Sequence, residues 1–144
     1  MYSIKGKIAF ITGASEGIGK ACAYAFAEQG VNLILTARRI TLLNEIADDI
    51  RSKFKVKVYA YKLDVTVREE VEVSVSHLPE EWKKIDILVN NAGLARGLEK
   101  LYEDDPDNWE VMIDTNIKGL LYLTRMVVPQ MVERKEGDVI NIGS

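Results

Sequence analysis

The stretch TGASEGIG, residues 12–19, decides the fold, because it joins a short apolar run to a helical pattern through three glycines spaced G-x-x-x-G-x-G. The run before it, residues 8–12, reads as a buried strand. Gly13 permits a tight turn, Gly17 permits a diphosphate to approach the backbone, and Gly19 permits the helix to pack close to the strand. A ligand-free turn does not explain three glycines in so short a stretch, so the loop is predicted to bind a nucleotide.

Short apolar runs alternate with helical patterns along the rest of the chain, which is typical of βαβ units around a parallel sheet. Several of the runs are hydrophobic without alternation, as expected for strands covered on both faces. Five strands are expected, at residues 8–12, 32–36, 58–63, 87–90 and 139–142, the last one buried. Right-handed crossovers then give an α/β fold, a Rossmann-like doubly wound parallel sheet that is incomplete at its C-terminal side.

Local signals predict where two of the four helical regions begin. Thr66 and Glu69 have the spacing of a capping box, which predicts the start of the third region. Asp105, followed by a proline, predicts an N-cap and the start of a long fourth region that runs to residue 137. Kinks in this last region are expected near residues 116–119 and at Pro129.

Composition indicates a soluble globular protein with one domain over residues 1–144, since 47% of the residues are hydrophobic and 28% are charged. A net charge of -3 argues against nucleic acid or an anionic membrane as the main partner. The single cysteine, Cys22, excludes an internal disulfide and fits a reducing, cytoplasmic location. We identify no targeting segment, no membrane span and no metal site in the sequence.

The end of the second expected strand indicates which nucleotide is bound. Sheets that bind NAD usually place an acid there to hold the ribose 2′-hydroxyl, but LILTARR, residues 33–39, has Ala37 at that place, followed by Arg38 and Arg39. Two guanidinium groups can bind a 2′-phosphate, so NADP is favoured, although the arginines could instead be solvated residues that open a helix. Glu16 is a complication, because it brings a negative charge near the phosphates.

Taken together, these features resemble the short-chain dehydrogenase/reductase superfamily, and within it the NADP-dependent 3-hydroxy acid (serine, allo-threonine) dehydrogenases. The resemblance runs the length of the chain: TGASEGIG, then LDV at 63–65, LVNNAG at 88–93, IDTNIKG at 113–119 and INIGS at 140–144. The narrower group rests on LPEEWKKIDILVNNAGLA at 78–95 and DNWEVMIDTNIKG at 107–119.

The resemblance implies a role for particular residues. Asp64 and Val65 would bind the adenine, although Asp64 could be a solvated acid at a strand end, and Asn90 would brace the sheet. Asn116 would help to hold a water in a proton relay, and Ser144 would orient the substrate. The cofactor-binding residues expected are Gly13, Ser15, Glu16, Gly17, Ile18, Gly19, Arg38, Arg39, Asp64, Val65, Asn91, Ala92 and Gly93.

The family pattern also contains a Y-x-x-x-K pair that supplies the general acid/base, and no tyrosine of this chain has a lysine four residues later. The chain is therefore expected to be the N-terminal part of a longer oxidoreductase acting on a small hydroxy compound, such as a 3-hydroxy acid, and to be inactive alone. A non-catalytic nucleotide-binding module and a structural scaffold are the alternatives.

The resemblance further implies that the strand at residues 139–142 lies inside the sheet of the intact protein and becomes an unpaired edge in this chain. It also implies that the intact protein forms a dimer or tetramer. Four apolar residues of the last helix could supply the contact between subunits, or the same residues could cover the sheet; they are Leu120, Leu123, Val127 and Met131.

Overall fold

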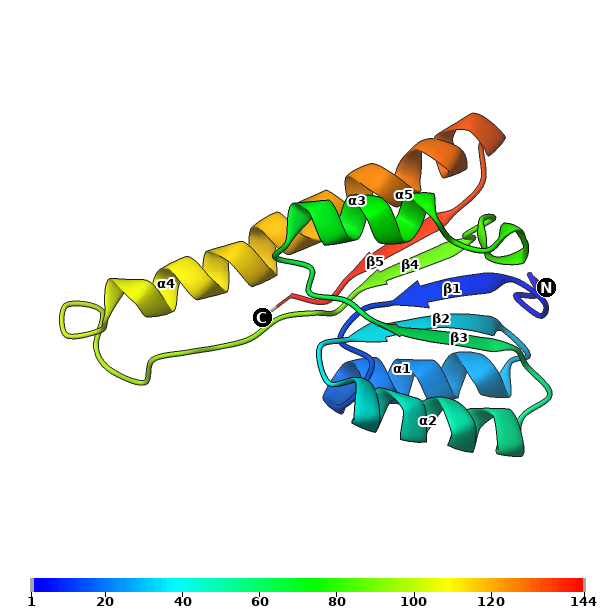
Figure 1. Ribbon diagram of the computed structural model, residues 1–144, viewed down its shortest axis with the longest axis horizontal. Coiled ribbons are helices and arrows are strands. Elements are labelled where there is room, and N and C mark those ends of the chain that lie inside the picture. The colour runs from blue at the N-terminus through cyan, green and yellow to red at the C-terminus, as the bar shows by residue number, and fades with distance from the viewer. Residues whose placement is uncertain (1, 144) are drawn as a thin grey trace.

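Five parallel strands form one sheet in the order β3-β2-β1-β4-β5 in the computed structural model, which describes residues 2–143 (Figure 1). This order is the one expected for a Rossmann-like sheet, with the chain running outward first to one side of β1 and then to the other. The strands are β1 (Ile8–Ile11), β2 (Asn32–Ala37), β3 (Val58–Lys62), β4 (Ile87–Asn90) and β5 (Asp138–Asn141).

Helices cover both faces of the sheet (Figure 1). On one face lie α1 (Gly17–Glu28) and α2 (Ile40–Lys53), and on the other lie α3 (Arg68–Ser76) and α5 (Leu120–Arg134). A short 3-10 helix, η1 (Glu80–Trp82), precedes β4. Among residues 2–143, no helix combines the length and the apolar character that a membrane crossing requires.

Alternation along β1 divides the apolar core into two layers. Ala9 and Ile11 belong to the layer under α1 and α2, whereas Phe10 belongs to the layer under α3 and α5, and all three side chains are fully buried. Because both faces of β1 are covered, its sequence can be apolar at every position. This explains why the runs before and after the glycine-rich loop show no polar alternation.

The third helix begins differently from the prediction. Its N-cap is Val67, which makes no side-chain capping hydrogen bond, so the capping-box assignment of Thr66 and Glu69 is wrong. The Thr66 hydroxyl donates instead to Asp64 Oδ1 at 2.7 Å, and the backbone N–H of Thr66 donates to the same oxygen at 3.0 Å. The carboxylate of Asp64 therefore organises the turn that leads into α3.

The region from residue 105 to residue 137 contains three helical segments in place of one. It begins with α4 (Pro106–Ile113), whose predicted N-cap Asp105 accepts a hydrogen bond from the backbone N–H of Asp107 at 2.9 Å. The π-helical segment η2 (Asp114–Gly119) follows, where the first kink is expected, and α5 then continues through Pro129 to Arg134. The irregularity is thus a π-helical turn, and Pro129 does not end the helix.

The last strand lies at an edge of the sheet, which confirms the edge position that the resemblance implies for this chain, whereas the prediction from its sequence that it is buried is wrong. All four residues of β5 are exposed, with Val139 and Ile140 at 40% and 41% of their maximal accessibility. The strand pairs with β4 through residues 87–90 and has no partner on its other side among the described residues. An apolar strand in this position keeps unpaired backbone N–H and C=O groups along one side.

Most of the apolar residues proposed for a subunit contact cover the sheet instead. Leu123, Val127 and Met131 are buried in the core layer under α3 and α5, which confirms the second alternative for these three residues, while Leu120 is half-buried. Other apolar side chains of this helical region are the exposed ones, namely Ile113, Ile117, Leu121 and Val132.

Candidate nucleotide-binding site

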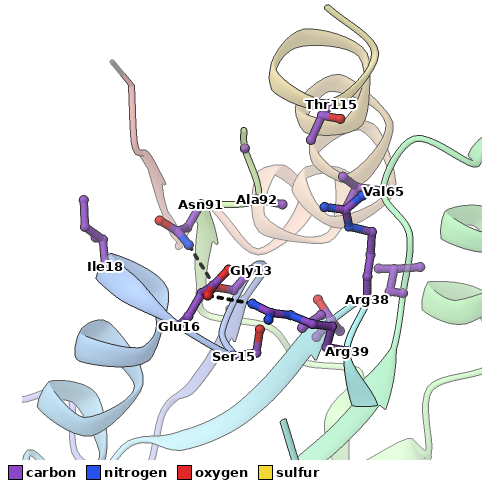
Figure 2. A pocket seen from close by; sticks show the side chains of 14 residues that line it. Gly13, Ser15, Glu16, Ile18, Arg38, Arg39, Val65, Asn91, Ala92 and Thr115 are labelled. Carbon is purple, nitrogen blue, oxygen red and sulfur yellow. Dashed lines mark hydrogen bonds and ion pairs between the residues drawn. The ribbon is translucent and has the colours of Figure 1, made fainter. Parts of the chain in front are cut away.

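A cleft of about 480 Å³ opens at the carboxyl ends of the strands, beside the glycine-rich loop (Figure 2). This is the edge of an open α/β sheet where ligands bind, at the point where the strand order reverses between β1 and β4. Its lining comes from residues of α1, β2 and η2 and from the loops after β1, β2, β3 and β4: Gly13, Ser15, Glu16, Ile18, Thr36, Ala37, Arg38, Arg39, Leu63, Val65, Asn91, Ala92, Gly93 and Thr115.

The three glycines of the loop have separate roles in its backbone. Gly13 and Gly17 adopt positive φ angles of 60° and 56°, which non-glycine residues rarely adopt. Gly19 has no such angle, but a Cβ atom there would lie 2.3 Å from the Gly13 carbonyl oxygen and 2.4 Å from Asn91 Nδ2. The tight turn at Gly13 and the close helix packing at Gly19 are therefore confirmed. Open space surrounds the Cβ position of Gly17.

A buried hydroxyl joins the glycine-rich loop to the end of β4. Thr12 Oγ1 accepts the backbone N–H groups of Asn91 at 3.0 Å and of Ala92 at 2.9 Å, and only 2% of Thr12 is exposed. Asn91 Nδ2 in turn donates to the carbonyl oxygens of Thr12 and Gly13 at 3.2 and 3.1 Å. These bonds hold the two segments that line the cleft in a fixed relation, as a rigid ligand site requires.

The cleft contains two positive side chains and one negative side chain among the lining residues. Arg39 reaches across to Glu16, with Nη2 2.6 Å from Oε2, whereas Arg38 extends away from this pair (Figure 2). Both arginines are exposed and follow β2 directly, where Ala37 occupies the position at which an acid would bind a ribose. The excess of positive charge fits a ligand with a phosphate at this end of the cleft.

The opposite wall of the cleft is formed by Val65, after β3, and by Thr115 of η2. These elements pack closely, because a Cβ atom at Gly119 would lie 2.6 Å from Val65 Cγ2. Leu63 and Val65 give this wall an apolar surface on which a planar base can lie. Asp64 is not among the lining residues, and its Oδ1 accepts the two hydrogen bonds from Thr66.

Asn116 lies in the π-helical segment, and its side-chain amide makes two hydrogen bonds to the backbone of one residue. Its Oδ1 accepts the backbone N–H of Leu94 at 2.9 Å, and its Nδ2 donates to the carbonyl oxygen of Leu94 at 2.9 Å. The side chain thereby fixes the segment after Gly93, and it does not line the cleft. Asn90 braces the sheet as predicted, because its Nδ2 donates to Thr124 Oγ1 and to Asn141 Oδ1.

The structure brings most of the predicted cofactor-binding residues together in one cleft. The exceptions are Gly17, Gly19 and Asp64, which shape the backbone nearby and do not line it. Ser144, predicted to orient the substrate, lies outside the described residues. Sequence reasoning missed Thr36, Leu63 and Thr115 as lining residues. The first two could have been found from their positions at strand ends, whereas the place of Thr115 depends on the packing of η2.

Metal ligands do not gather in the described part of the chain, where no three or more His, Cys, Asp or Glu side chains form a potential metal site. His77, which has no motif match, is exposed at the C-cap of α3, with Nδ1 2.9 Å from the carbonyl oxygen of Val73.

Comparisons with known proteins agree with this geometry. A family model described as short chain dehydrogenase matches residues 7–144. The chain is 47% identical over 137 residues to the NADP-dependent 3-hydroxy acid dehydrogenase YdfG of Shigella flexneri, covering 95% of this chain and 54% of that protein. It is 42% identical to the NADP-dependent 3-hydroxy acid dehydrogenase of Schizosaccharomyces pombe, covering 100% of this chain and 56% of the relative.

A solved structure described as the closed form of serine dehydrogenase complexed with NADP+ superposes with a TM-score of 0.89 at 47% identity, covering 95% of this chain and 54% of that one. The chain thus spans about half the length of the curated relatives that it matches.

Proposed function

Because the chain belongs to the short-chain dehydrogenase family, we propose that it is the N-terminal, cofactor-binding part of an NADP-dependent oxidoreductase. The proposed reaction transfers a hydride between the nicotinamide and a small hydroxy compound, and a 3-hydroxy acid such as serine is the proposed substrate class. The relatives that carry these names are 42–47% identical to the chain.

One observation carries the choice of NADP: two arginines follow β2 at the cleft, beside Ala37 and without a carboxylate at the position of the ribose ligand. A guanidinium group can donate two parallel hydrogen bonds to a phosphate, and each charge-assisted bond is worth about 1.5–3 kcal/mol. Arg38 and Arg39 would therefore hold the 2′-phosphate.

The remaining lining residues suit the other parts of a dinucleotide. Ser15 of the loop and Ile18 at the N-terminus of α1 would face the diphosphate and nicotinamide ends, with free N–H groups and the helix dipole favouring an anion. Val65 would contact the adenine, with Asp64 beside it. Asn91, Ala92 and Gly93 would line the ribose and nicotinamide side.

Catalysis would require residues of this chain together with a tyrosine and lysine pair that the chain does not contain at the family's spacing. Ser144 would orient the substrate oxygen, and Asn116 would help to hold a water, through its position in η2. NADP supplies the hydride acceptor or donor when it is bound. The proton-transfer tyrosine and its lysine would come from the rest of the longer protein, which we propose to be a cytoplasmic homo-oligomer.

Cofactor affinities test the proposal. The full-length protein should bind NADP at least tenfold more tightly than NAD in calorimetric titrations, as expected if one or more charge-assisted contacts hold the 2′-phosphate. Arg38→Asp should reverse or abolish the preference, whereas Arg125→Asp, at an exposed position of α5 outside the cleft, should retain it. Equal affinities for the two cofactors in the unaltered protein would contradict the assignment.

Activity distinguishes the oxidoreductase from a non-catalytic module. The full-length protein should reduce NADP in the presence of serine or a related 3-hydroxy acid, and the 144-residue chain by itself should not. A full-length protein that binds NADP tightly and oxidises no hydroxy acid would instead support the binding module.

A further inference from the structure

The ion pair between Glu16 and Arg39 spans one side of the nucleotide cleft (Figure 2). It joins the glycine-rich loop to the end of β2, and both side chains line the cleft. Arg38, the other cation of the site, makes no ion pair with any described residue. The two arginines that would share a phosphate therefore differ, since one guanidinium is available and the other is engaged by a carboxylate.

The side chain of Glu16 does not cap the helix that follows the loop. This residue occupies the N-cap position of α1, but its side chain makes no capping hydrogen bond, and its backbone is extended at φ -161° and ψ 171°. The side chains of Glu16 and Arg39 are 73% and 57% exposed, so the carboxylate is not needed to neutralise a buried charge. Among the described residues, the ion pair with Arg39 is the one polar interaction of the Glu16 side chain.

We propose that Glu16 is a specificity-determining residue that lowers the preference for NADP over NAD by competing with the 2′-phosphate for Arg39. This inference rests on the proposed function, because it concerns how the same cleft selects between two cofactors. Glu16 would thus lower the ratio of NADP affinity to NAD affinity, whereas the two arginines raise it.

The comparison of the two cofactors removes the effect of Glu16 on the groups that NADP and NAD share, because repulsion between Glu16 and the diphosphate acts on both alike and cancels in the ratio of their affinities. Direct repulsion between Glu16 and the 2′-phosphate acts on NADP alone, and a double-mutant cycle with Arg39 separates it from the effect of the ion pair. Only NADP carries the 2′-phosphate that must share or displace the partner of Arg39. NAD can bind while the pair of Glu16 with Arg39 remains intact.

The expected size follows from the exposure of the pair. Exposed ion pairs contribute up to about 1 kcal/mol, which corresponds to a factor of about five in affinity. Replacing Glu16 with glutamine keeps the shape of the side chain and removes its charge. Glu16→Gln should therefore raise the ratio of NADP affinity to NAD affinity by about two- to fivefold.

A double-mutant cycle on the full-length protein tests the route through Arg39. Dissociation constants for NADP and NAD are measured by calorimetry for the unaltered protein, Glu16→Gln, Arg39→Gln and the double variant. The rise in NADP preference caused by Glu16→Gln should fall by at least half when Arg39 is also replaced. Glu28→Gln, an exposed glutamate at the other end of α1, is the matched control and should leave the ratio unchanged.

The outcomes separate this inference from the function on which it rests. An unchanged or lower NADP preference in Glu16→Gln overturns the inference, and so does an equal effect of Glu16→Gln with and without Arg39. In both cases NADP binding by the unaltered protein leaves the proposed function standing. A folded, unaltered protein that binds neither cofactor contradicts the proposed function and the inference together.

Discussion

Two strands of the same sheet, β2 and β5, both contain apolar residues in sequence and lie in opposite environments. In β2 the residues from Leu33 to Ala37 are all buried, whereas every residue of β5 is exposed. The strands differ in their neighbours, because β2 lies between β1 and β3 and β5 pairs with β4 alone (Figure 1). An apolar run thus predicts a strand, but its burial depends on what packs around it.

The helices reinforce this difference. On the face under α1 and α2, the residues of β1 and β2 are buried by the two helices. The loops that line the cleft include those that follow these two strands, and we call this part of the molecule the covered half. Ile140 points to the same face as its register partner Val89, which is 1% exposed, yet Ile140 is 41% exposed. The nucleotide-binding half of the molecule therefore completes its own core, and the β5 half leaves apolar surface uncovered.

The largest expected effect of this asymmetry is on association. The isolated 144-residue chain should self-associate or precipitate, because β5 offers an unpaired edge with two exposed apolar residues and because Ile113, Ile117 and Leu121 are exposed on the helical region before it. Sedimentation velocity of the purified chain measures this directly. A stable monomer at tens of micromolar, an order-of-magnitude working concentration for aggregation-prone species, would contradict the prediction.

A charge on β5 shows whether the edge itself is responsible. Ile140→Lys should shift the isolated chain toward the monomer, because a lysine on an exposed edge strand opposes strand pairing. Leu42→Lys is the matched control, since Leu42 is an exposed apolar residue on α2, in the covered half. Equal effects of the two substitutions would indicate general solubility and not edge pairing.

The same asymmetry explains how much could be predicted from the sequence. Strand positions, strand order and the glycine-rich loop follow from local patterns, and Gly13 and Gly19 have the predicted roles. The predicted capping box at Thr66 does not form, because the Thr66 hydroxyl donates to the carboxylate of Asp64 instead. The edge position of β5 follows from the resemblance and not from its apolar run, and the π-helical place of Thr115 depends on packing between distant segments, which local patterns do not record.

The next largest effect is expected when a methyl group is added at Gly19, in the covered half of the molecule. Gly19→Ala places a Cβ atom against Gly13 and Asn91, so it should lower the free energy of unfolding by about 2–3 kcal/mol, as overpacking does. Gly143→Ala, after β5, meets open space and should change it by less than about 0.5 kcal/mol. Urea denaturation of the full-length variants compares the two. A Gly19→Ala protein as stable as the unaltered one would show that the loop can relax.

A smaller effect is expected at the hydroxyl that joins the loop to β4. Thr12→Val keeps the shape of the side chain and leaves the N–H groups of Asn91 and Ala92 without their acceptor, which should cost about 1–3 kcal/mol. Thr12→Ser retains the hydroxyl and should recover much of this loss. Urea midpoints of the two variants decide the point, and equal destabilisation by valine and serine would assign the effect to packing alone.

The smallest effect is expected at β3, the strand at the other edge of the sheet, which carries aromatic side chains. Tyr61 packs edge-on against Phe10, with ring centroids 6.3 Å apart, and burial raises the pKa of Tyr61 from 10.0 to about 12. The unfolded chain loses this proton near pH 10, so the contribution to stability is complete below pH 10 and is lost as pH rises toward 12. Tyr61→Phe should therefore flatten the decline in urea midpoint across this window, while Tyr24, whose pKa is raised to about 12 chiefly by its hydrogen bond to Asp49, still contributes a slope. An unchanged pH profile in Tyr61→Phe would show that the Tyr61 hydroxyl is as accessible to water in the folded protein as in the unfolded chain.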